Sequence, residues 1–112
     1  MSSCLVTVDD NIAKRYHILM ISSFRSKETE KVWYLDISRK YPEEIQRTAL
    51  RKLVMLDKSK DINDLRIPPA NRLEKLKGDR DGQYSIRVND KWRICFEWKE
   101  GNAFNVEIVD YH

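Results

Sequence analysis

The sequence predicts an α+β fold in which N-terminal helices pack on one face of a small antiparallel β-sheet. Two observations lead to this prediction. Apolar and polar residues alternate along three runs between residues 84 and 109, and a period of two is typical of strands with one buried face. An amphipathic segment that opens at Pro42 precedes these runs, so helical and strand-like patterns are segregated along the chain, as in α+β proteins.

The first third of the chain contains the shorter elements. Residues 1–19 show no clear period, and Met20 is a candidate natural start, because the apolar run 21–24 after it is a candidate first strand. We therefore divide the chain into an N-terminal extension, 1–19, and one domain, 20–112. A short helix is predicted over 26–35, with Ser26 as its cap and acidic residues near its positive end.

The clearest helix opens at Pro42, because proline suits the first helical position and the two glutamates that follow favour the positive end of the helix dipole. Apolar residues at helical spacing predict its buried face: Ile45, Ala49, Leu53 and Leu56. The basic residues are predicted to point elsewhere: Arg47, Arg51, Lys52 and Lys58. One more helical turn is predicted over 61–66, which Pro68 ends because the residue before a proline avoids helical geometry.

Three strands are predicted over 84–88, 92–98 and 104–109, and short polar turns join them into an antiparallel meander. A further strand is placed at 72–77, although its leucines do not share a period of two. Side chains of opposite parity point to opposite faces, so Arg93 points away from the face that packs on the helices. By the same count Tyr111 shares that open face, and His112 lies there by strand-end twist or at the rim.

Composition narrows the functional class. A chain of 112 residues with 21 basic side chains and a net charge of +3 is a single domain, and residues 58–99 hold 11 of the basic residues against 7 acids. This favours a polyanionic partner. Cys4 and Cys95 are far apart and are predicted to stay reduced in a cytoplasm, with no membrane segment. Two histidines and two cysteines at these spacings predict no metal site.

Four segments of the chain resemble the HigB type of toxin in the RelE-like superfamily of toxin-antitoxin systems. They are Asn71–Arg80, Gly82–Ile86, Trp92–Phe96 and Asp110–His112. The resemblance runs from Met20 to His112. It implies a RelE-like fold and a bacterial endoribonuclease without cofactors, which cleaves messenger RNA in the ribosomal decoding site and so arrests translation and growth. It also implies a HigA-type helix-turn-helix antitoxin that silences the toxin, and operator DNA reached only through the antitoxin complex.

The same resemblance implies the site residues. Lys77, Arg80 and Arg93 match cationic active-site positions, and Tyr111 and His112 match a terminal pair near the scissile phosphate. This chain departs from the family at two positions. Glu74 stands where well-studied members have a histidine, and Asn89 stands where some have an arginine. The RNA-binding side chains expected beside the catalytic ones are Lys75, Arg87, Asn89 and Lys91.

Each residue type suits metal-free RNA cleavage, in which the 2′-hydroxyl attacks the neighbouring phosphate. His112 is the leading proton-transfer candidate, because an ordinary imidazole pKa lies near neutrality. Glu74 is the leading base by position. Arginine offers phosphate a planar fork of donors and lysine a point charge, so Lys77, Arg80 and Arg93 are expected to converge on the phosphate. Tyr111 is expected to stack on or orient a base.

Structural alternatives remain open at this stage. Lys77 and Arg80 also suit a solvated turn around Gly78, Arg93 suits an ion pair with Glu107 across the sheet, and His112 suits an idle chain end. The two departures also suit a catalytically weak or inactive module that binds RNA or the ribosome and acts mainly as an operon co-repressor. The modest net charge disfavours a general single-strand RNA binder. The antitoxin either covers the basic face or docks on the helices.

Overall fold

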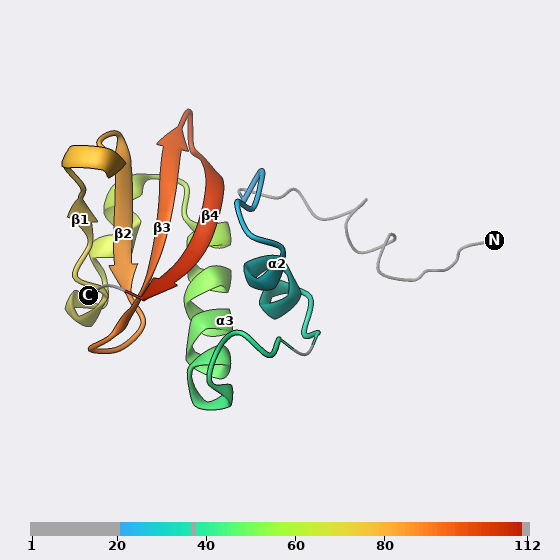
Figure 1. Ribbon diagram of the computed structural model, residues 1–112. Coiled ribbons are helices and arrows are strands. Elements are labelled where there is room, and N and C mark those ends of the chain that lie inside the picture. The colour runs from blue at the N-terminus through green and yellow to red at the C-terminus, as the bar shows by residue number, and fades with distance from the viewer. Residues whose placement is uncertain (1–20, 37, 111–112) are drawn as a thin grey trace.

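The structure is a computed structural model that describes residues 21–36 and 38–110. Helix α3 (Glu43–Lys58) lies behind a four-stranded antiparallel sheet, and α2 (Lys27–Trp33) lies beside its edge (Figure 1). The strands follow the order β1 (Glu74–Lys75), β2 (Gln83–Arg87), β3 (Trp92–Lys99) and β4 (Asn102–Asp110). The predicted α+β class and the antiparallel meander are confirmed, whereas the predictions for residues 1–19, Tyr111 and His112 lie outside the described residues.

Helix α2 begins as its sequence predicts. The Oγ of Ser26 accepts from the backbone N–H groups of Glu28 at 3.1 Å and Thr29 at 3.3 Å, which satisfies two donors that an uncapped helix leaves unpaired. The buried Thr29 Oγ1 in turn accepts from the backbone N–H of Ile108 in β4. The candidate strand 21–24 pairs with β4 only through two isolated parallel bridges.

Helix α3 begins at Glu43, one residue later than predicted, with Pro42 at its cap position. Its predicted buried face is confirmed, because Ile45, Ala49, Leu53 and Leu56 are all buried. The prediction that Lys52 points elsewhere is wrong: its side chain is buried and Nζ donates to Asn71 Oδ1 over 2.5 Å. Position 52 lies three residues after Ala49 and four before Leu56, so it borders the apolar stripe.

A β-bulge in β4 changes which residues of that strand are buried. Cys95 pairs with Glu107, but Glu97 pairs with Phe104, so β4 holds one extra residue between these pairs. Asn105 lies within the bulge at φ 52°. The predicted alternation therefore fails at Phe104, which shares the face of Glu97, and Ala103 takes the fully buried place. A bulge inserts a residue into one strand and so reverses parity beyond it.

The segment between α3 and β2 consists of short turns. The predicted helical turn at 61–66 is confirmed as the 3₁₀ helix η1 (Ile62–Arg66), and two more follow as η2 (Pro69–Asn71) and η3 (Gly78–Arg80). The strand predicted over 72–77 is reduced to β1: Arg72 adopts left-handed geometry at φ 46°, so the extended backbone begins only after it. Beyond β1, Leu76 N–H still donates to Gln83 O at 2.8 Å.

Candidate active site

The two faces of the sheet differ sharply in chemistry. The face toward the helices carries fully buried apolar side chains: Ile86, Ile94, Phe96, Val106 and Ile108. On the opposite face, which we call the open face, strand pairing aligns Ser85 with Cys95 and Arg87 with Arg93. Directly paired residues share a face, so the predicted direction of Arg93, away from the helices, is confirmed.

Arg93 is held by two neighbouring segments. Its Nε donates to Ser85 Oγ on β2 over 2.8 Å, and its Nη2 donates to the backbone oxygen of Arg72 over 2.7 Å. The side chain is 10% exposed, so the guanidinium is nearly buried yet still reaches the surface of the open face. A planar group bonded at two nitrogens has a fixed orientation.

Glu74 lies beside this guanidinium. Its Oε1 is 3.9 Å from Arg93 Nη2, because β1 pairs Glu74 with Ser85 and so turns its side chain to the open face. Glu107, the alternative partner considered for Arg93, lies 3.3 Å from Arg80 Nη1 and 4.0 Å from Arg25 Nε. The structure therefore brings Glu74 and Arg93 together and pairs Glu107 with other arginines.

Arg93 and four residues around it line a small hollow of about 230 Å³, which we call the arginine hollow: Arg72, Arg87, Asn89, Asp90 and Arg93. Three guanidinium groups against one carboxylate make it electropositive. Asp90 forms an ion pair with Arg87, and its own side chain is almost fully exposed. The volume is below the range of about 300–1,000 Å³ typical of drug-sized ligands and suits a group such as phosphate.

The turn between β2 and β3 forms one wall of the arginine hollow. The Oδ1 of Asn89 accepts from the backbone N–H groups of Lys91 at 2.9 Å and Trp92 at 2.8 Å, so this side chain shapes the turn. Lys91 is exposed and lies 3.5 Å from the carboxylate of Asp110. Asp110 also pairs with Trp92, so the last described residue of β4 lies at the same end of the sheet as the hollow.

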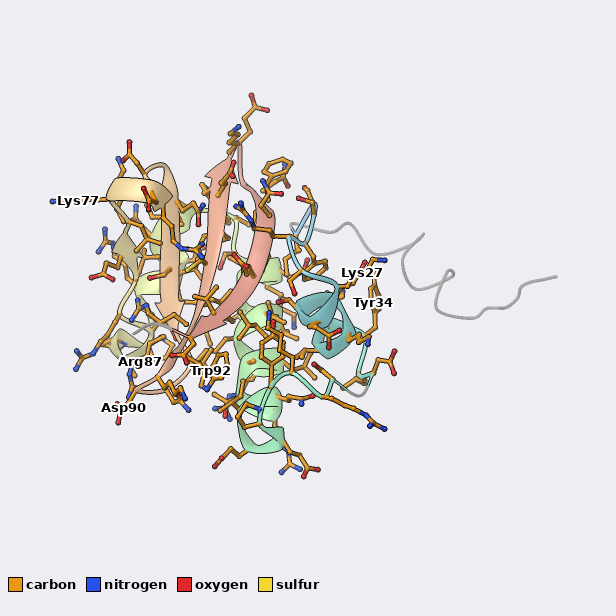
Figure 2. All side chains as sticks on the ribbon, in the orientation of Figure 1. Lys27, Tyr34, Lys77, Arg87, Asp90 and Trp92 are labelled. Carbon is orange, nitrogen blue, oxygen red and sulfur yellow. The ribbon has the colours of Figure 1, made fainter. Side chains whose placement is uncertain are left out.

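The remaining predicted residues do not line the arginine hollow. Figure 2 places Lys77 at the opposite end of the sheet from Arg87 and Asp90, and Lys77 is exposed. Arg80 lies in η3, donates to Gln83 Oε1 over 3.1 Å and forms an ion pair with Glu107. The turn around Gly78 is therefore anchored to the sheet through Arg80 and is not simply solvated. Lys75 is exposed on β1. Tyr111 and His112 lie outside the described residues. Of the three cations expected to converge, Arg80 and Arg93 both act on the pKa of the Cys95 thiol on the open face, whereas Lys77 lies apart.

Sequence reasoning assigned no role to Arg72, Ser85 or Asn71. Arg72 lines the arginine hollow and supplies a backbone acceptor to Arg93, whereas Ser85 is fully buried beneath the guanidinium. Asn71 is fully buried and tethers the loop that carries Arg72. The parity of Ser85, two residues before Arg87 and opposite to that of Tyr84 and Ile86, was a usable signal for a polar group on the open face.

Burial shifts two pKa values near the site. Burial lowers the pKa of Lys52, and the nearby charges of Arg51 and Arg87 lower it further. Burial raises the pKa of the Cys95 thiol, which lies on the open face between Ser85 and Glu107. Within residues 21–36 and 38–110, histidine, cysteine and acidic side chains form no cluster of three suited to a metal ion, and no helix has the length and apolar character needed to cross a membrane.

Comparison with known proteins gives the family. Residues 22–112 match the family described as the RelE-like toxin of the type II toxin-antitoxin system HigB. The chain is 41% identical to Toxin HigB-1 of Vibrio cholerae over 87 aligned residues, and this alignment covers 77% of this chain and 92% of that protein. It is 31% identical to Endoribonuclease HigB of Proteus vulgaris over 93 aligned residues, and this alignment covers 83% of this chain and 100% of that protein.

A solved structure supports the fold. The YoeB-YefM complex from Staphylococcus aureus aligns with a TM-score of 0.53 and 19% identity over 82% of this chain and 97% of that one. At this identity the likeness concerns the fold, which is the RelE-like arrangement of helices on one face of an antiparallel sheet. From the family match and the two relatives together, the chain belongs to the HigB-like family of RelE-like toxins of type II toxin-antitoxin systems.

Proposed function

We propose that this toxin is a ribosome-dependent, metal-independent endoribonuclease of the cytoplasm that cleaves messenger RNA in the decoding site and so arrests translation and growth. The name of the Proteus vulgaris relative, an endoribonuclease, supports the reaction class. The observation that carries the proposal is Arg93, a nearly buried guanidinium fixed at two nitrogens beside the arginine hollow.

A fixed cation suits this reaction. When the 2′-hydroxyl attacks, negative charge grows on the phosphorus oxygens, and a donor already oriented toward that charge needs no reorganisation. Arg93 has this property, since Ser85 Oγ and the Arg72 oxygen hold it in place. Arg72 and Arg87 line the same hollow and would bind the flanking phosphate oxygens.

The proton transfers need two further groups. Glu74, 3.9 Å from Arg93, is the proposed base for the 2′-hydroxyl, and His112 is the proposed acid for the departing 5′-oxygen. His112 follows Asp110 by two residues, and Asp110 pairs with Trp92 next to Arg93. Tyr111 would orient a base by stacking. These assignments rest on the family resemblance together with the position of Asp110.

The more distant cations have a different proposed role. Lys77 lies toward the other end of the sheet, so in this proposal it acts on the messenger or ribosomal RNA at a phosphate other than the reacting one. Arg80 is bonded to Glu107 on β4, next to Cys95, so in this proposal it contacts the RNA backbone from the middle of the open face. Lys75 and Lys91 are exposed and would add to this electrostatic contact, and Asn89 would act mainly by shaping the turn.

The test uses purified toxin, ribosomes stalled on a defined messenger, and mapping of new RNA ends. Arg93→Lys keeps the charge but loses the planar fork, and removal of one such transition-state donor typically costs about 10²-fold to 10³-fold in rate. Lys58→Met, an exposed change at the end of α3, is the matched control and should cleave like the native protein. A folded Arg93→Lys toxin that cleaves at the native rate would overturn the proposal.

Two further arms of that experiment test the finer claims. Naked messenger should stay intact, because ribosome dependence requires the decoding site to position the substrate. A chelator should leave cleavage unchanged where divalent ions are replaced by polyamines that keep the ribosome assembled. Cleavage of naked messenger would contradict ribosome dependence, and loss of cleavage with the chelator while polyamines keep the ribosome assembled would contradict metal independence.

One observation favours a second function, that of a weak or inactive module that binds RNA or the ribosome. Arg93 exposes only a tenth of its side chain and already has a carboxylate 3.9 Å away. In this case the toxin would bind ribosomes without producing new RNA ends, and it would act mainly with its antitoxin on operator DNA. Growth arrest without cleavage would establish this alternative.

The proposed partner is a HigA-type helix-turn-helix antitoxin, which either covers the open face or docks on the helices. The first mode predicts an affinity that falls steeply with salt, because the arginine hollow would be paired with acidic groups. Measuring the affinity of the complex at two ionic strengths, for the native toxin and for Arg87→Gln, separates the modes. An affinity independent of both salt and residue 87 would favour the helices.

A further inference from the structure

A buried lysine on α3 reaches the loop behind the arginine hollow. Lys52 is only 8% exposed, and its Nζ donates to Asn71 Oδ1 over 2.5 Å. Within the described part of the chain, Lys52 forms no ion pair with an acidic side chain. The charged groups that shift its pKa are the cations Arg51 and Arg87. A buried ammonium with a neutral partner is costly, and an apolar side chain of similar length would fill this place at lower cost.

Asn71 connects this lysine to the loop around it. Its side chain is fully buried, and its Nδ2 donates to Leu65 O in η1 over 3.1 Å. Its backbone N–H donates to Pro68 O over 2.9 Å. The side-chain amide of Asn71, the last residue of η2, therefore connects η2 to α3 and to η1. Together with the backbone bond to Pro68, these hydrogen bonds keep the backbone at residue 71 in place.

The next residue carries this restraint to the open face. Arg72 has left-handed backbone geometry at φ 46°, which is costly for a side chain other than glycine or asparagine, so neighbouring contacts must hold it. Its N–H donates to Pro69 O over 3.0 Å, and its carbonyl oxygen accepts from Arg93 Nη2 over 2.7 Å. The carbonyl reaches Arg93 only while this geometry persists.

We propose that Lys52 and Asn71 are positioning residues: they hold the Arg72 carbonyl where it orients the guanidinium of Arg93. Lys52 touches neither substrate nor the reacting atoms in this scheme, and it acts through the loop. The consequence for catalysis rests on the proposed function of Arg93, whereas the restraint on Arg93 itself can be measured without any RNA.

The direct test follows the Arg93 Nε–H signal in ¹⁵N nuclear magnetic resonance, assigned by its loss in Arg93→Lys. This proton is bonded to buried Ser85 Oγ, so its exchange with solvent reports local opening of Arg93. Lys52→Met should speed that exchange about fivefold to thirtyfold, the effect expected for one lost buried hydrogen bond. Lys52→Gln keeps an amide donor and should restore part of the protection. Lys58→Met, exposed on the same helix, should exchange like the native protein.

The second readout separates positioning from general loss of structure. If Arg93 acts on the reacting phosphate, Lys52→Met should lower kcat for ribosome-bound messenger by a similar factor and leave KM unchanged. A folded Lys52→Met toxin with native exchange of Arg93 Nε–H would overturn the proposal. Should Lys52→Met fail to fold, Asn71→Asp replaces it, because it keeps an oxygen for Lys52 and loses the donor to Leu65. Native exchange there would overturn the proposal too.

The two proposals fail separately. If the native toxin cleaves no messenger but Lys52→Met still speeds the exchange of Arg93 Nε–H, the restraint exists and the enzymatic function does not. If the native toxin cleaves and the exchange is unchanged in Lys52→Met, Arg93 is catalytic and is held by Ser85 without help from α3.

Discussion

The two faces of one sheet differ in what their buried side chains do. On the helix side, Ile94 is surrounded by other apolar residues and removes hydrocarbon from water. On the open side, the adjacent residue Arg93 is nearly as buried, but its contacts include a hydroxyl, two backbone oxygens and a carboxylate 3.9 Å away. Neighbours in sequence therefore have different roles: one contributes stability, and the other is oriented at some cost to stability.

Burial alone therefore does not identify a core residue. A buried apolar group is stabilised by transfer from water, whereas a buried charge requires several well-placed partners. Ser85, the Arg72 carbonyl and Glu74 are these partners, and they come from three different segments of the chain. Three substitutions on the sheet test this contrast, in order of decreasing expected effect, and a fourth on the α2 side of the molecule has a smaller effect than these.

Ile94→Ala tests the helix side. It should lower the free energy of unfolding by about 2–5 kcal/mol, because it removes buried hydrocarbon and leaves a cavity between the sheet and α3. Urea unfolding followed by circular dichroism measures the change. A loss below that produced by a polar truncation on the open face would break the contrast.

Ser85→Ala tests the open side at the residue that supports Arg93. It should lower the free energy of unfolding by about 1–3 kcal/mol, since the Nε–H of a buried guanidinium loses its acceptor. The same variant should reduce messenger cleavage more than Ile94→Ala does when both are assayed well below their unfolding transitions. Ser85→Thr keeps the hydroxyl and serves as the control; equal loss of cleavage in all three would contradict the distinction.

Cys95→Ala tests the buried thiol of the open face. Burial raises the pKa of Cys95 above its ordinary value of 9.0, so the folded state holds this proton more tightly than the unfolded chain does. The thiol's contribution to stability is therefore complete below pH 9.0 and is lost as the pH rises through the raised pKa. Urea midpoints measured between pH 7 and pH 10 should fall more for the native protein than for Cys95→Ala, and parallel curves would contradict the shift.

Ser38→Ala gives the smallest effect and concerns the helix α2. The hydroxyl of Ser38 donates to Glu28 over 2.7 Å and, together with Lys31, holds the pKa of Glu28 below its ordinary value of 4.5. The contribution of Glu28 is thus present above pH 4.5 and is lost as the pH falls through the lowered pKa. Carboxyl titration by nuclear magnetic resonance should show a higher pKa in Ser38→Ala, and an unchanged value would remove Ser38 as the cause.

Much of the fold could be predicted because its signals are local. Ser26 caps α2, the apolar stripe of α3 is buried, and the alternation in β2 and β3 identifies the core face. The failures share one cause, since each depends on a partner distant in sequence. The bulge at Asn105 reverses the parity of Phe104, and the left-handed Arg72 shortens β1.

The candidate site was predictable in part. Parity assigned Arg93 to the open face, and the resemblance pointed to Glu74, which the structure brings within 3.9 Å of it. Parity tells which face a side chain lies on but not how far along the strand it lies. The separation of Lys77 from the arginine hollow could therefore be seen only in the structure. Nor does a helical wheel show that Lys52 borders a loop with an amide oxygen in reach.

The class of fold, the core face of β2 and β3 and the family can all be inferred without coordinates, because periodicity and local motifs lie in neighbouring residues. Which polar groups meet follows only from the folded chain. Lys52 with Asn71, Arg93 with the Arg72 oxygen, and Glu107 with Arg80 are all contacts between segments distant in sequence. Such contacts depend on strand register and loop geometry, which hydrogen bonding across the whole domain fixes cooperatively.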